Sequence, residues 1–382
     1  MHIAIDCRMY GSSGIGTYIT GCLPYFLSSC HSFTLICSGG TVPAILKMCA
    51  RRSNYSIVVY NKKPFSMQEL FFLPNKIAKK INECDLYYSP FFNIPQGINI
   101  PIYTTIHDVI FPDMPELTSK IGLTLRMWFY KRACKKSKKI FTVSEFSASR
   151  IRHHFESQKK LNIIVTYNGV QEQLLNINTA FVQKQKTIIF VGNIKKHKGL
   201  QFLLEAFLKA QNELSLQGQN YRLLILGQKE NFRSKDKTAL LQLNTACNSA
   251  EQRGIKYGSN KNQSQLIEFS GVVDAQKLKI LLSEASLLVQ PSLYEGFCYP
   301  PLEALFCATN VLISDIPVLK EIYGGYPVTF FRAGDVADLK EKLIAILKNG
   351  IPAPVELSKE LKQKYTFEKT AAAVLSALDD PN

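Results

Sequence analysis

The sequence predicts an α/β fold built from two Rossmann-like, doubly wound domains that face each other across a cleft. Short apolar runs of strand length alternate with helical segments along nearly the whole chain, which is the pattern of parallel α/β proteins. Most connections between the runs are long enough for the crossover helices that parallel strands need. The same series starts afresh at Thr187 after a polar stretch, so two domains of this type are predicted.

Strands are expected at thirteen apolar runs. Those of the first half are Ile3–Asp6, Phe33–Cys37, Ser56–Tyr60, Leu86–Tyr88, Ile102–Ile106, Ile140–Val143 and Ile163–Thr166. Those of the second half are Thr187–Val191, Leu223–Leu226, Leu266–Phe269, Leu287–Val289, Val311–Ile313 and Val328–Phe330. Open α/β sheets bind ligands outside the carboxyl ends of their strands. Functional residues are therefore expected just after strands in both halves.

The boundary between the domains is expected in a polar segment without clear periodicity. We predict an N-terminal domain over 1–170, a linker over 171–186 and a C-terminal domain over 187–365. The remaining segment, 366–382, is expected to form a C-terminal helix, for which packing back on the N-terminal domain is one option. A second polar stretch, 248–264, is interpreted as a surface insertion rather than another boundary.

Composition places the chain among globular proteins and makes it basic. Of its 382 residues, 46% are hydrophobic and 20% are charged, and the net charge is +16. Residues 1–180 hold 21 basic and 10 acidic side chains, so most of the excess charge lies in the N-terminal half. Such a field is attractive to nucleic acid, an anionic membrane surface or a phosphorylated ligand, and charge alone does not choose among them.

Cysteine usage and hydropathy predict a cytoplasmic protein. The ten cysteines include no C-x-x-C pair, and most lie inside apolar runs, where a thiol packs as a small hydrophobic group. Neither disulfides nor a zinc site is expected. The chain opens with a strand-like run rather than a signal peptide, and no window has the ~20 continuous apolar residues of a membrane span. We expect a protein that is soluble or bound to a membrane surface.

Two strand ends of the first half carry candidate substrate contacts. The glycine turn Gly11–Tyr18 opens a helix after the first strand. Its glycines permit positive φ, and the helix N-terminus offers N–H groups to an anion. His107 follows the fifth strand and can act as an acid, a base or a hydrogen-bond donor near neutral pH. The alternative for the glycine turn is that it binds no ligand, and the alternative for His107 is a structural histidine. Consecutive side chains of an extended segment point apart, so Asp108 is poorly placed to orient the imidazole of His107. Asp108 is therefore expected in a turn or a helix cap.

The segment Lys120–Lys139 is a basic stretch with helical spacing of its apolar residues. It holds eight basic side chains and no acidic one, and it includes Trp128, the only tryptophan of the chain. A basic amphipathic helix can lie on an anionic bilayer. The alternative is a helix that packs its apolar face on its own sheet and exposes its charges to water. The two interpretations are compatible.

A second basic cluster follows the first strand of the second half. Lys195, Lys196 and Lys198 lie in the segment Gly192–Gly199, which opens a helix at Leu200. Positive charge at a helix N-terminus opposes the macrodipole, so it costs stability unless an anion is bound there. A phosphate would remove that conflict, and lysine is a good point charge for it. A solvated basic loop is the alternative.

The most specific pattern is a pair of glutamates eight residues apart in Pro291–Leu305. Glu295 lies on the loop after the strand Leu287–Val289, and Glu303 lies in the helix that follows. The residues around Glu303 are apolar, so we expect its carboxylate to be partly buried. A buried carboxylate needs hydrogen-bond partners, and the paired hydroxyls of a sugar or ribose would serve.

Taken together, these residues resemble the retaining glycosyltransferases of family 4, which have a GT-B fold. The segment Pro291–Glu303 matches the Glu-x7-Glu motif of that family. The similarity covers nearly the whole chain and is carried further by Gly14-Ile15-Gly16, His107-Asp108, Val143–Ser147, Tyr167–Val170, Val191–Asn193, Lys198-Gly199 and Leu226-Gly227. Family members often carry Arg where Asn193 stands, and Gly where Cys298 and Ala308 stand. Lys195 or Lys196 is a candidate to replace that arginine.

The resemblance implies a role for each site residue. In such enzymes the C-terminal domain holds a nucleotide-sugar donor and the N-terminal domain holds the acceptor. The implied catalytic residues are His107, beside the reacting sugar, and Glu295, which contacts the transferred sugar. The implied substrate-binding residues are the backbone of Gly14, Ile15, Gly16, Gly296 and Phe297, Asn193, Lys198 at the diphosphate, and Glu303 at the ribose.

The resemblance also implies a reaction. The chain resembles the mannosyltransferase-like members of the family, which build bacterial surface polysaccharides such as lipopolysaccharide O-antigen, capsule or exopolysaccharide. We expect retaining transfer of a hexose, with GDP-mannose as the first candidate donor and UDP-, dTDP- or ADP-sugars as alternatives. The expected acceptor is a lipid-linked oligosaccharide at the inner face of the cytoplasmic membrane. Front-face attack is favoured over a covalent intermediate, for which Glu295 is the only carboxylate considered.

Neither a cofactor nor a metal is expected, because no Asp-x-Asp motif occurs and positive side chains with helix N-termini can stabilise the leaving diphosphate. Two rival classes remain. An NAD(P)-dependent oxidoreductase would need an acidic residue after the second strand, where the chain reads Cys37-Ser38-Gly39-Gly40. A nucleic-acid-binding protein would account for the charge but not for Glu295 and Glu303. We therefore expect no nucleic-acid partner.

Overall fold

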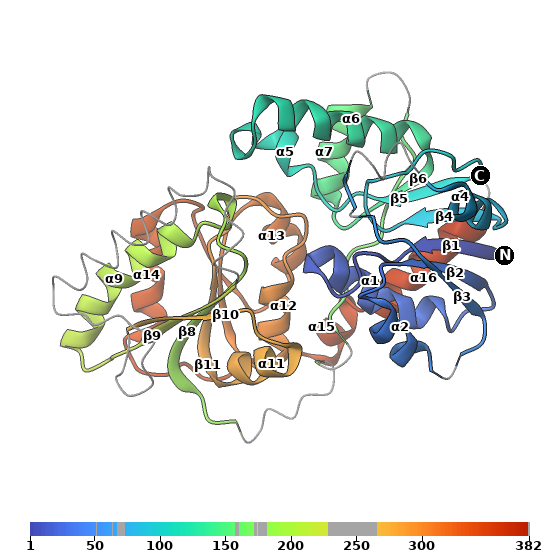
Figure 1. Cartoon of the computed structure of the whole chain (residues 1–382). Helices are drawn as coiled ribbons and strands as arrows, with labels where there is room; N and C mark the ends of the chain where they lie inside the picture. The colour runs from blue at the N-terminus through green and yellow to red at the C-terminus, as the bar shows by residue number, and fades with distance from the viewer. Residues whose placement is uncertain are drawn as a thin grey trace. The chain divides into compact units, whose positions relative to one another are not determined.

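A computed structural model describes residues 1–50, 52–62, 64–66, 73–156, 160–171, 174, 182–227 and 266–380. The chain divides into two compact units. The first consists of Met1–Glu172 together with Tyr365–Asn382, and the second of Gln173–Lys364. Each unit is a parallel sheet with helices on both faces (Figure 1), so the predicted fold class is confirmed. The predicted surface insertion, 248–264, lies outside the described residues.

The described part of the first unit contains a seven-stranded parallel sheet in the order β3-β2-β1-β4-β5-β6-β7. Its strands are β1 (His2–Asp6), β2 (Ser32–Cys37), β3 (Tyr55–Val59), β4 (Leu86–Ser89), β5 (Ile102–Thr105), β6 (Ser137–Thr142) and β7 (Ile163–Val165). The order reverses at β1, where Ile3 pairs with Phe33 on one side and Leu86 on the other. The seven predicted strands of the first half are confirmed within a few residues at each end.

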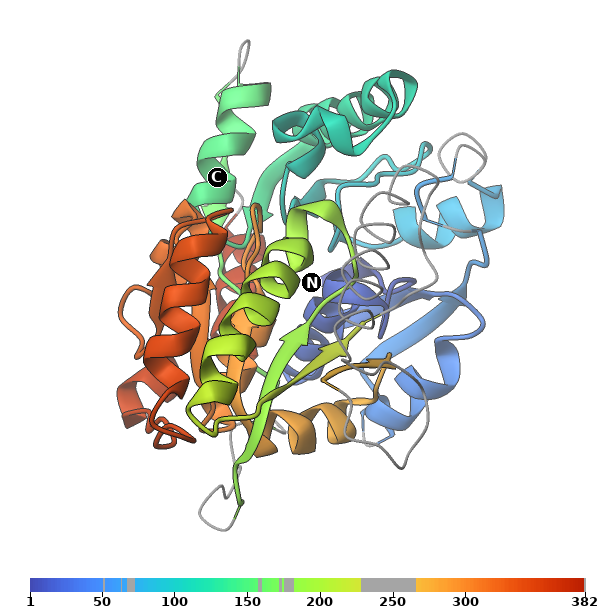
Figure 2. The ribbon, with the colours of Figure 1, turned by 90° about the vertical axis from the view of Figure 1, so that its left-hand side faces the viewer.

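Helices cover both faces of this sheet (Figures 1 and 2). They are α1 (Ser13–Phe26), α2 (Val42–Cys49), α4 (Asn75–Asn82), α5 (Ile110–Asp113), α6 (Lys120–Lys136), α7 (Glu145–Phe155) and α16 (Phe367–Asp379), with a short 3-10 turn at Pro115–Leu117. Ile81 of α4, Tyr130 of α6 and Ile151 of α7 join one buried cluster with Ala4 and Ile140 of the sheet. These three helices therefore cover the same face.

The C-terminal helix α16 packs against α1 of the first unit (Figure 1). Two glycines make room for it. A Cβ atom on Gly21 would lie 2.2 Å from the ring of Phe367, and one on Gly169 would lie 2.0 Å from the backbone nitrogen of the same residue. Thr366 also forms a parallel bridge with Val170. The close approach of the two segments explains why glycine occupies both positions.

The basic segment Lys120–Lys139 is divided between two elements, contrary to the expectation of one solvent-facing helix. Helix α6 ends at Lys136, and β6 begins at Ser137. Lys139 is buried in that strand, where its Nζ donates hydrogen bonds to the carbonyl oxygens of Ala377 (3.2 Å) and Asp380 (2.8 Å). A cation at a helix C-terminus is favourable, so Lys139 stabilises the end of α16 and is not available to a membrane.

The described part of the second unit contains a six-stranded parallel sheet in the order β10-β9-β8-β11-β12-β13. Its strands are β8 (Gln185–Val191), β9 (Arg222–Leu226), β10 (Ile267–Gly271), β11 (Ala285–Gln290), β12 (Asn310–Ser314) and β13 (Thr329–Phe331). Its helices are α9 (Leu200–Leu216), α11 (Ala275–Glu284), α12 (Tyr299–Phe306), α13 (Pro317–Tyr323), α14 (Val336–Leu347) and α15 (Lys359–Lys364), with a 3-10 turn at Lys196–Lys198. The predicted strands of the second half are confirmed.

Helices α9 and α14 pack together on one face of the second sheet, and α11 and α12 lie on the other face (Figure 1). Phe207 of α9 and Leu343 of α14 share a buried cluster with Ile188 and Leu223 of the sheet. Because all strands are parallel, their carboxyl ends meet at one edge of each sheet. The loops that follow β8 and β11 therefore lie at the same edge of the second unit.

Candidate active site

The loops after β8 and β11 are joined by their backbones. The N–H of Leu293 donates to the carbonyl oxygen of His197 over 2.7 Å. A Cβ atom on Gly199, whose φ is 67°, would lie 1.9 Å from the carbonyl oxygen of Pro291. Only glycine fits that approach and that left-handed backbone. The two loops therefore hold the side chains of Lys198 and Glu295 in a fixed relation.

Lys198 and Glu295 form an ion pair in this junction. The Nζ atom of Lys198 lies 2.7 Å from Oε1 and 2.8 Å from Oε2 of Glu295. The side chain of Glu295 is 8% exposed and that of Lys198 is 21% exposed, so the carboxylate is buried and the lysine is only partly accessible to solvent. Burial alone would raise the pKa of Glu295, but the charge and hydrogen bonds of Lys198 and a hydrogen bond from Ser292 together lower it. The carboxylate is ionised at neutral pH.

Glu303 lies in the next helix, α12, and has a different environment. Its side chain is 7% exposed, and burial raises its pKa to about 7. Among the described residues no side-chain hydrogen bond or ion pair holds its carboxyl group. A buried carboxylate in this state is costly, and a ligand with two neighbouring hydroxyls would supply the missing donors. The predicted burial of the Glu303 carboxylate is thus present in the structure.

The remaining predicted contacts of the second unit lie around this pair. Gly296 and Phe297 are in the loop between Glu295 and the first turn of α12. Asn193 is exposed in the loop after β8. His197, between Lys196 and Lys198 of that loop, has its pKa lowered to about 4 by burial and by the neighbouring Lys198. It is neutral at physiological pH, so Lys198 carries the positive charge next to Glu295.

In the first unit the predicted glycine turn forms the start of α1. Gly14, Ile15 and Gly16 lie in its first turn, after Gly11 with φ 70°. A Cβ atom on Gly16 would lie 2.5 Å from the carbonyl oxygen of Met9. The turn therefore needs glycine at position 16 for packing, whether or not a ligand binds there. Gly14 is exposed at the helix N-terminus, where backbone N–H groups favour anions.

His107 follows β5 and is held in one orientation. Its Nε2 lies 2.9 Å from the carbonyl oxygen of Pro90, and its ring meets that of Tyr18 edge-on with the centroids 5.0 Å apart. Because a carbonyl only accepts, Nε2 carries the proton in this bond. Burial lowers the pKa of His107 to about 4, so the neutral ring presents the lone pair of Nδ1. Asp108 accepts from the N–H of Ile110 at 3.1 Å, which confirms the predicted turn role.

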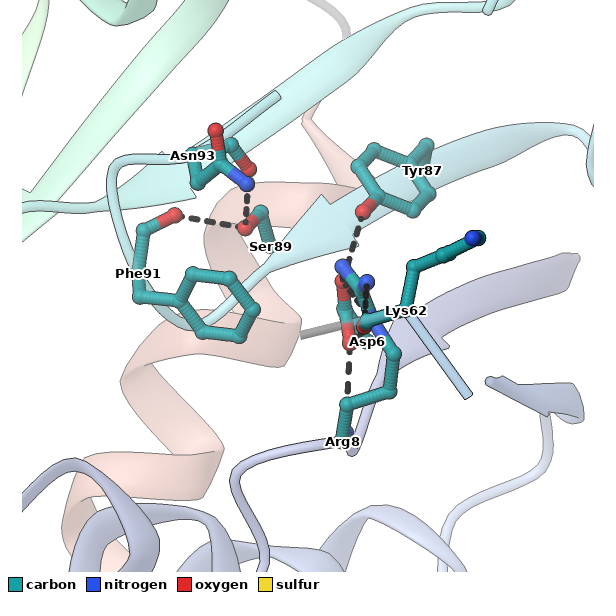
Figure 3. A network of polar contacts seen from close by, with 7 residues as sticks. All are labelled: Asp6, Arg8, Lys62, Tyr87, Ser89, Phe91 and Asn93. Atoms are coloured by element: carbon teal, nitrogen blue, oxygen red, sulfur yellow. Dashed lines mark hydrogen bonds and ion pairs between the residues drawn. The ribbon is translucent and has the colours of Figure 1, made fainter. Parts of the chain in front are cut away.

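A buried ion pair lies at the carboxyl end of β1 (Figure 3). The guanidinium of Arg8 forms a fork with the carboxylate of Asp6, and the hydroxyl of Tyr87 donates to the same carboxylate over 3.2 Å. A further N–H of Arg8 donates to the carbonyl oxygen of Lys62 (3.2 Å), and the guanidinium lies 4.8 Å from the centre of the Tyr60 ring. This network joins the ends of β1, β3 and β4 just before the glycine turn.

The loop after β4 is fixed by Ser89 in the same region (Figure 3). The Ser89 hydroxyl lies 2.5 Å from the carbonyl oxygen of Phe91 and 3.1 Å from that of Asn93. All three residues are buried. The loop that provides the carbonyl partner of His107, at Pro90, is thereby held in place.

Comparison with known proteins assigns the chain to a family. Residues 173–365, more than half of the chain, match the family model described as glycosyl transferases group 1. The chain belongs to the group 1 glycosyl transferases. Residues 12–174 match a second model, described as glycosyltransferase family 4. The resemblance seen in the sequence is therefore confirmed, and the two models cover the two units.

Individual relatives of this glycosyl transferase are more distant. O-antigen chain mannosyltransferase B of Escherichia coli is 27% identical over 66% of this chain and 61% of the relative. O-antigen chain mannosyltransferase RfbU of Salmonella typhimurium is 27% identical over 57% of this chain and 53% of the relative. The chain thus spans little more than half the length of these curated relatives. The crystal structure of a glycosyltransferase from Rickettsia africae has a TM-score of 0.64 at 14% identity, covering 98% and 97% of the two chains. That likeness shows the shared fold.

Two departures from the family pattern have a clear backbone consequence in this glycosyl transferase. Cys298 and Ala308, where family members often carry glycine, both have positive φ, 73° and 54°. Cys298 precedes the first residue of α12, and Ala308 follows its C-cap. A side chain in the left-handed region costs about 1–2 kcal/mol. The backbone keeps the glycine conformation although the residues have changed.

Replacing Ala308 with glycine should therefore stabilise the second unit. We expect the free energy of unfolding to rise by about 0.5–1 kcal/mol, because relief of the left-handed strain exceeds the entropy that glycine adds to the unfolded chain. Urea unfolding followed by circular dichroism measures the change. Ala345→Gly, in the exposed interior of α14, is the matched control and should lower stability by about 1 kcal/mol. A loss of stability in Ala308→Gly would contradict the assignment of strain.

Sequence patterns did not indicate two groups of residues at these strand ends. Ser292 donates to Oε1 of Glu295 over 2.6 Å, and Gln290 contacts Ser292. Asp6 and Arg8 form the buried pair of the first unit. The only signals in the sequence were a polar residue, Gln290, at the end of one apolar strand and the Asp-x-Arg spacing at the end of another strand. Both are too common to single out a site without knowledge of what surrounds them.

Proposed function

We propose that this chain transfers a hexose from a nucleotide-sugar donor to a saccharide acceptor. The observation that carries the proposal is the Lys198–Glu295 ion pair at the same sheet edge as the buried, unpaired carboxyl group of Glu303. A fixed cation suits a diphosphate, and an acceptor-only carboxylate suits the two hydroxyls of a ribose. The family membership and the Glu-x7-Glu spacing support the same assignment.

In this proposal the second unit binds the donor and stabilises its departure. As the glycosidic bond breaks, negative charge develops on the leaving diphosphate, and a preorganised cation lowers the barrier. Lys198 supplies that cation, with the backbone N–H groups near Gly296 and Phe297 as further donors. Family members often carry Arg where this chain has Asn193. The exposed Lys195 and Lys196 lie in the same loop and add to the local positive potential.

We further propose retention by front-face attack. A covalent mechanism would use Glu295 as nucleophile, but both of its oxygens accept hydrogen bonds from Lys198 and one also accepts from Ser292. These bonds occupy lone pairs that a nucleophile would need. His107, neutral and with Nδ1 unprotonated, would accept a hydrogen bond from a sugar hydroxyl rather than act as a general acid. The anomeric configuration of the first product, read by proton NMR, tests retention.

For the donor, we propose GDP-mannose. The named relatives are mannosyltransferases of O-antigen synthesis, which favours mannose and a polysaccharide acceptor on a lipid carrier. A screen of GDP-, UDP-, dTDP- and ADP-sugars by calorimetry and by slow donor hydrolysis is the direct experiment. Binding of GDP-mannose alone would support the proposal. Binding of another nucleotide sugar in its place would reassign the donor, and binding of none would overturn the function.

The affinity for the donor nucleotide should increase with pH up to about 7. In the free protein the pKa of Glu303 is raised to about 7, so below that pH the group is a neutral acid. Ribose hydroxyls donate to it and favour the carboxylate, which lowers its pKa in the complex and releases a proton on binding. Affinity should thus fall by up to about tenfold per pH unit below 7 and level off above it.

Calorimetry with a nucleoside diphosphate in buffers of different ionisation enthalpy measures both effects. Glu303→Gln is the matched control, because it keeps the shape and removes the titration, while the phosphate of the ligand titrates equally in both proteins. The variant should bind about 10–100-fold more weakly at pH 8, the range for hydrogen bonds to a charged group. Identical pH dependence in wild type and Glu303→Gln would exclude Glu303 from the ribose site.

We propose that the first unit binds the acceptor and rests peripherally on an anionic membrane at its cytoplasmic side. No helix among the described residues is long and apolar enough to cross a bilayer. The support comes from α6, where Ile121 (84% exposed), Leu125 and Trp128 form an exposed stripe. The exposed lysines of the same helix are Lys120, Lys131, Lys135 and Lys136. Apolar side chains flanked by lysines suit the interface of an anionic bilayer.

Sedimentation with vesicles containing phosphatidylglycerol should detect this binding at low salt and lose it at high salt. Each lysine near the surface contributes about 1 kcal/mol, so Lys131→Gln, Lys135→Gln and Lys136→Gln combined should weaken binding about a hundredfold. The matched control changes two exposed lysines of α15, Lys359 and Lys362, to Gln. Absence of wild-type binding at low salt, or equal loss in the control, would contradict a role for α6.

A further inference from the structure

A buried chain of side-chain hydrogen bonds runs from the end of β11 to the ion pair. Gln290, the last residue of the strand, places its Nε2 2.9 Å from the hydroxyl of Ser292. The Ser292 hydroxyl lies 2.6 Å from Oε1 of Glu295, which in turn contacts Lys198. Gln290 and Ser292 are both fully buried. Four polar side chains are thus connected in series at the base of the proposed donor site.

The proton arrangement in this chain is fixed by its charged end. Glu295 is an anion and can only accept, so the single proton of the Ser292 hydroxyl must point to it. The Ser292 oxygen then accepts from Gln290, whose NH2 group donates. The Oε1 of Gln290 is buried and has no hydrogen-bond partner among the described residues. Leaving this carbonyl oxygen without a hydrogen bond costs free energy. That cost accompanies the side-chain orientation in which the NH2 group of Gln290 donates to Ser292.

The backbone of Ser292 is held independently. The hydroxyl of Ser314, at the end of β12, donates to the carbonyl oxygen of Ser292 over 2.5 Å. The N–H of the next residue, Leu293, donates to His197 in the loop that carries Lys198. Ser292 is therefore fixed through both its side chain and its peptide groups. Its hydroxyl has a definite position from which to orient a carboxylate.

We propose that Ser292, oriented by Gln290, is a positioning residue that holds the Glu295 carboxylate against the Lys198 ammonium before the donor binds. Neither residue is expected to touch the donor. Held in this way, the ammonium remains at one place. A preorganised cation needs no reorganisation when charge develops on a leaving group. The kinetic part of this inference rests on the proposed function, and its geometric part does not.

The groups that face Glu295 allow a direct measurement. Lys198 and His197 face it from the loop after β8, and Cys298 from its own loop. His197 is neutral above about pH 4 and burial raises the pKa of the Cys298 thiol, so Lys198 is the charged partner near neutrality. Loss of the Ser292 hydrogen bond should raise the pKa of Glu295, because that bond stabilises the carboxylate. The titration of Glu303 near pH 7 is well separated.

The experiment is a carbon-13 NMR titration of glutamate-labelled, donor-free protein, with the Glu295 signal assigned from its absence in Glu295→Gln. In the wild type the midpoint of Glu295 should lie below that of an ordinary glutamate. In Ser292→Ala its midpoint should move to higher pH, and Gln290→Met should move it in the same direction by less. Ser286→Ala is the matched control. It removes a buried hydroxyl from the same strand, at the end that contacts the carbonyl oxygen of Gln185, and it should change nothing.

Kinetics provide the second readout. With saturating donor, the kcat of Ser292→Ala should fall about tenfold, the equivalent of one hydrogen bond to a charged group. Ser292→Thr, which keeps the hydroxyl, should recover most of it. An unchanged Glu295 midpoint in folded Ser292→Ala would overturn the positioning role even if the enzyme is active. A shifted midpoint in a protein that transfers no sugar would instead overturn the proposed function and leave the positioning role in place.

Discussion

Replacement of Lys198 by methionine is expected to lower kcat by about a hundredfold to a thousandfold. That range corresponds to removal of one preorganised donor from a developing negative charge. The ammonium of Lys198 is held at 2.7 Å and 2.8 Å from the oxygens of Glu295, and the lysine side chain is 21% exposed. Its charge should matter more at the transition state, where the diphosphate gains charge, than in the bound ground state.

The ion pair complicates a simple deletion, so the design includes its partner. Without Lys198, Glu295 becomes a buried carboxylate with no counterion, and its pKa should rise. The double variant Lys198→Met with Glu295→Gln removes that second effect. If the ammonium itself is the catalytic element, the double variant should be as slow as Lys198→Met. Recovery of activity in the double variant would show that the unpaired carboxylate, and not the lost cation, is what damages Lys198→Met.

Lys195→Met is the matched control for this prediction. Lys195 is an exposed lysine of the same loop, so its replacement changes the net charge equally without breaking the ion pair. We expect a loss in kcat of less than about tenfold, as for a screened surface charge. Turnover is measured at saturating donor, so that a change in KM does not enter. Normal turnover of Lys198→Met under those conditions would reduce Lys198 to a structural partner of Glu295.

The fold was predictable because it depends on patterns that are local in sequence. Strand-length apolar runs and crossover spacing predicted every strand of the two described sheets. The start of β6, however, was predicted three residues too late, and this has a physical reason. Its first three residues, Ser137-Lys138-Lys139, are polar and continue the basic run of α6, so periodicity extends the helix too far. The strand forms there because Ser137 and Lys139 pair with Ile102 and Tyr103 of β5, and the Lys139 side chain is bonded to residues more than 230 positions away.

The candidate site was predictable where a residue type and a strand end coincide. Lys198 and Glu295 lie in loops that follow strands, and Glu303 lies in the helix after the second loop, so residue type and position together indicated them. The direct contact of Lys198 with Glu295 depends on the approach of two loops that are 97 positions apart. No local pattern encodes that approach. The same holds for the low pKa of His107, which is set by burial beneath residues from other elements.

The buried pair of the first unit leads to the largest expected effect on stability. Arg8→Met should lower the free energy of unfolding of that unit by about 3–5 kcal/mol, because it leaves the Asp6 carboxylate buried without a counterion. Both side chains are almost fully buried. The hydrogen bond from Tyr87 to Asp6 remains, but a neutral hydroxyl compensates only part of the lost charge. Asp6→Asn should be similarly costly, since it removes the carboxylate that balances the buried guanidinium.

The effects of the two substitutions on the free energy of unfolding should not be additive. Once one partner is gone, removal of the other eliminates a buried unpaired charge, so the double variant Asp6→Asn with Arg8→Met should be more stable than the sum of the single losses predicts, by about 2 kcal/mol or more. Trp128 is the only tryptophan of the chain and lies in α6 of the same unit. Its fluorescence in urea therefore reports unfolding of the unit that contains the pair.

Lys80→Met provides the comparison with an exposed pair. Lys80 and Glu83 are 57% and 46% exposed, and such pairs contribute little to stability, so the urea midpoint should hardly move. A midpoint for Arg8→Met close to that of Lys80→Met would mean that water or a neighbouring group compensates Asp6 in solution. A large loss in the free energy of unfolding, with strong non-additivity, would instead establish that the Asp6–Arg8 pair stabilises the end of β1 and the glycine turn after it. Removal of either member alone would then be more harmful than its share of the double substitution.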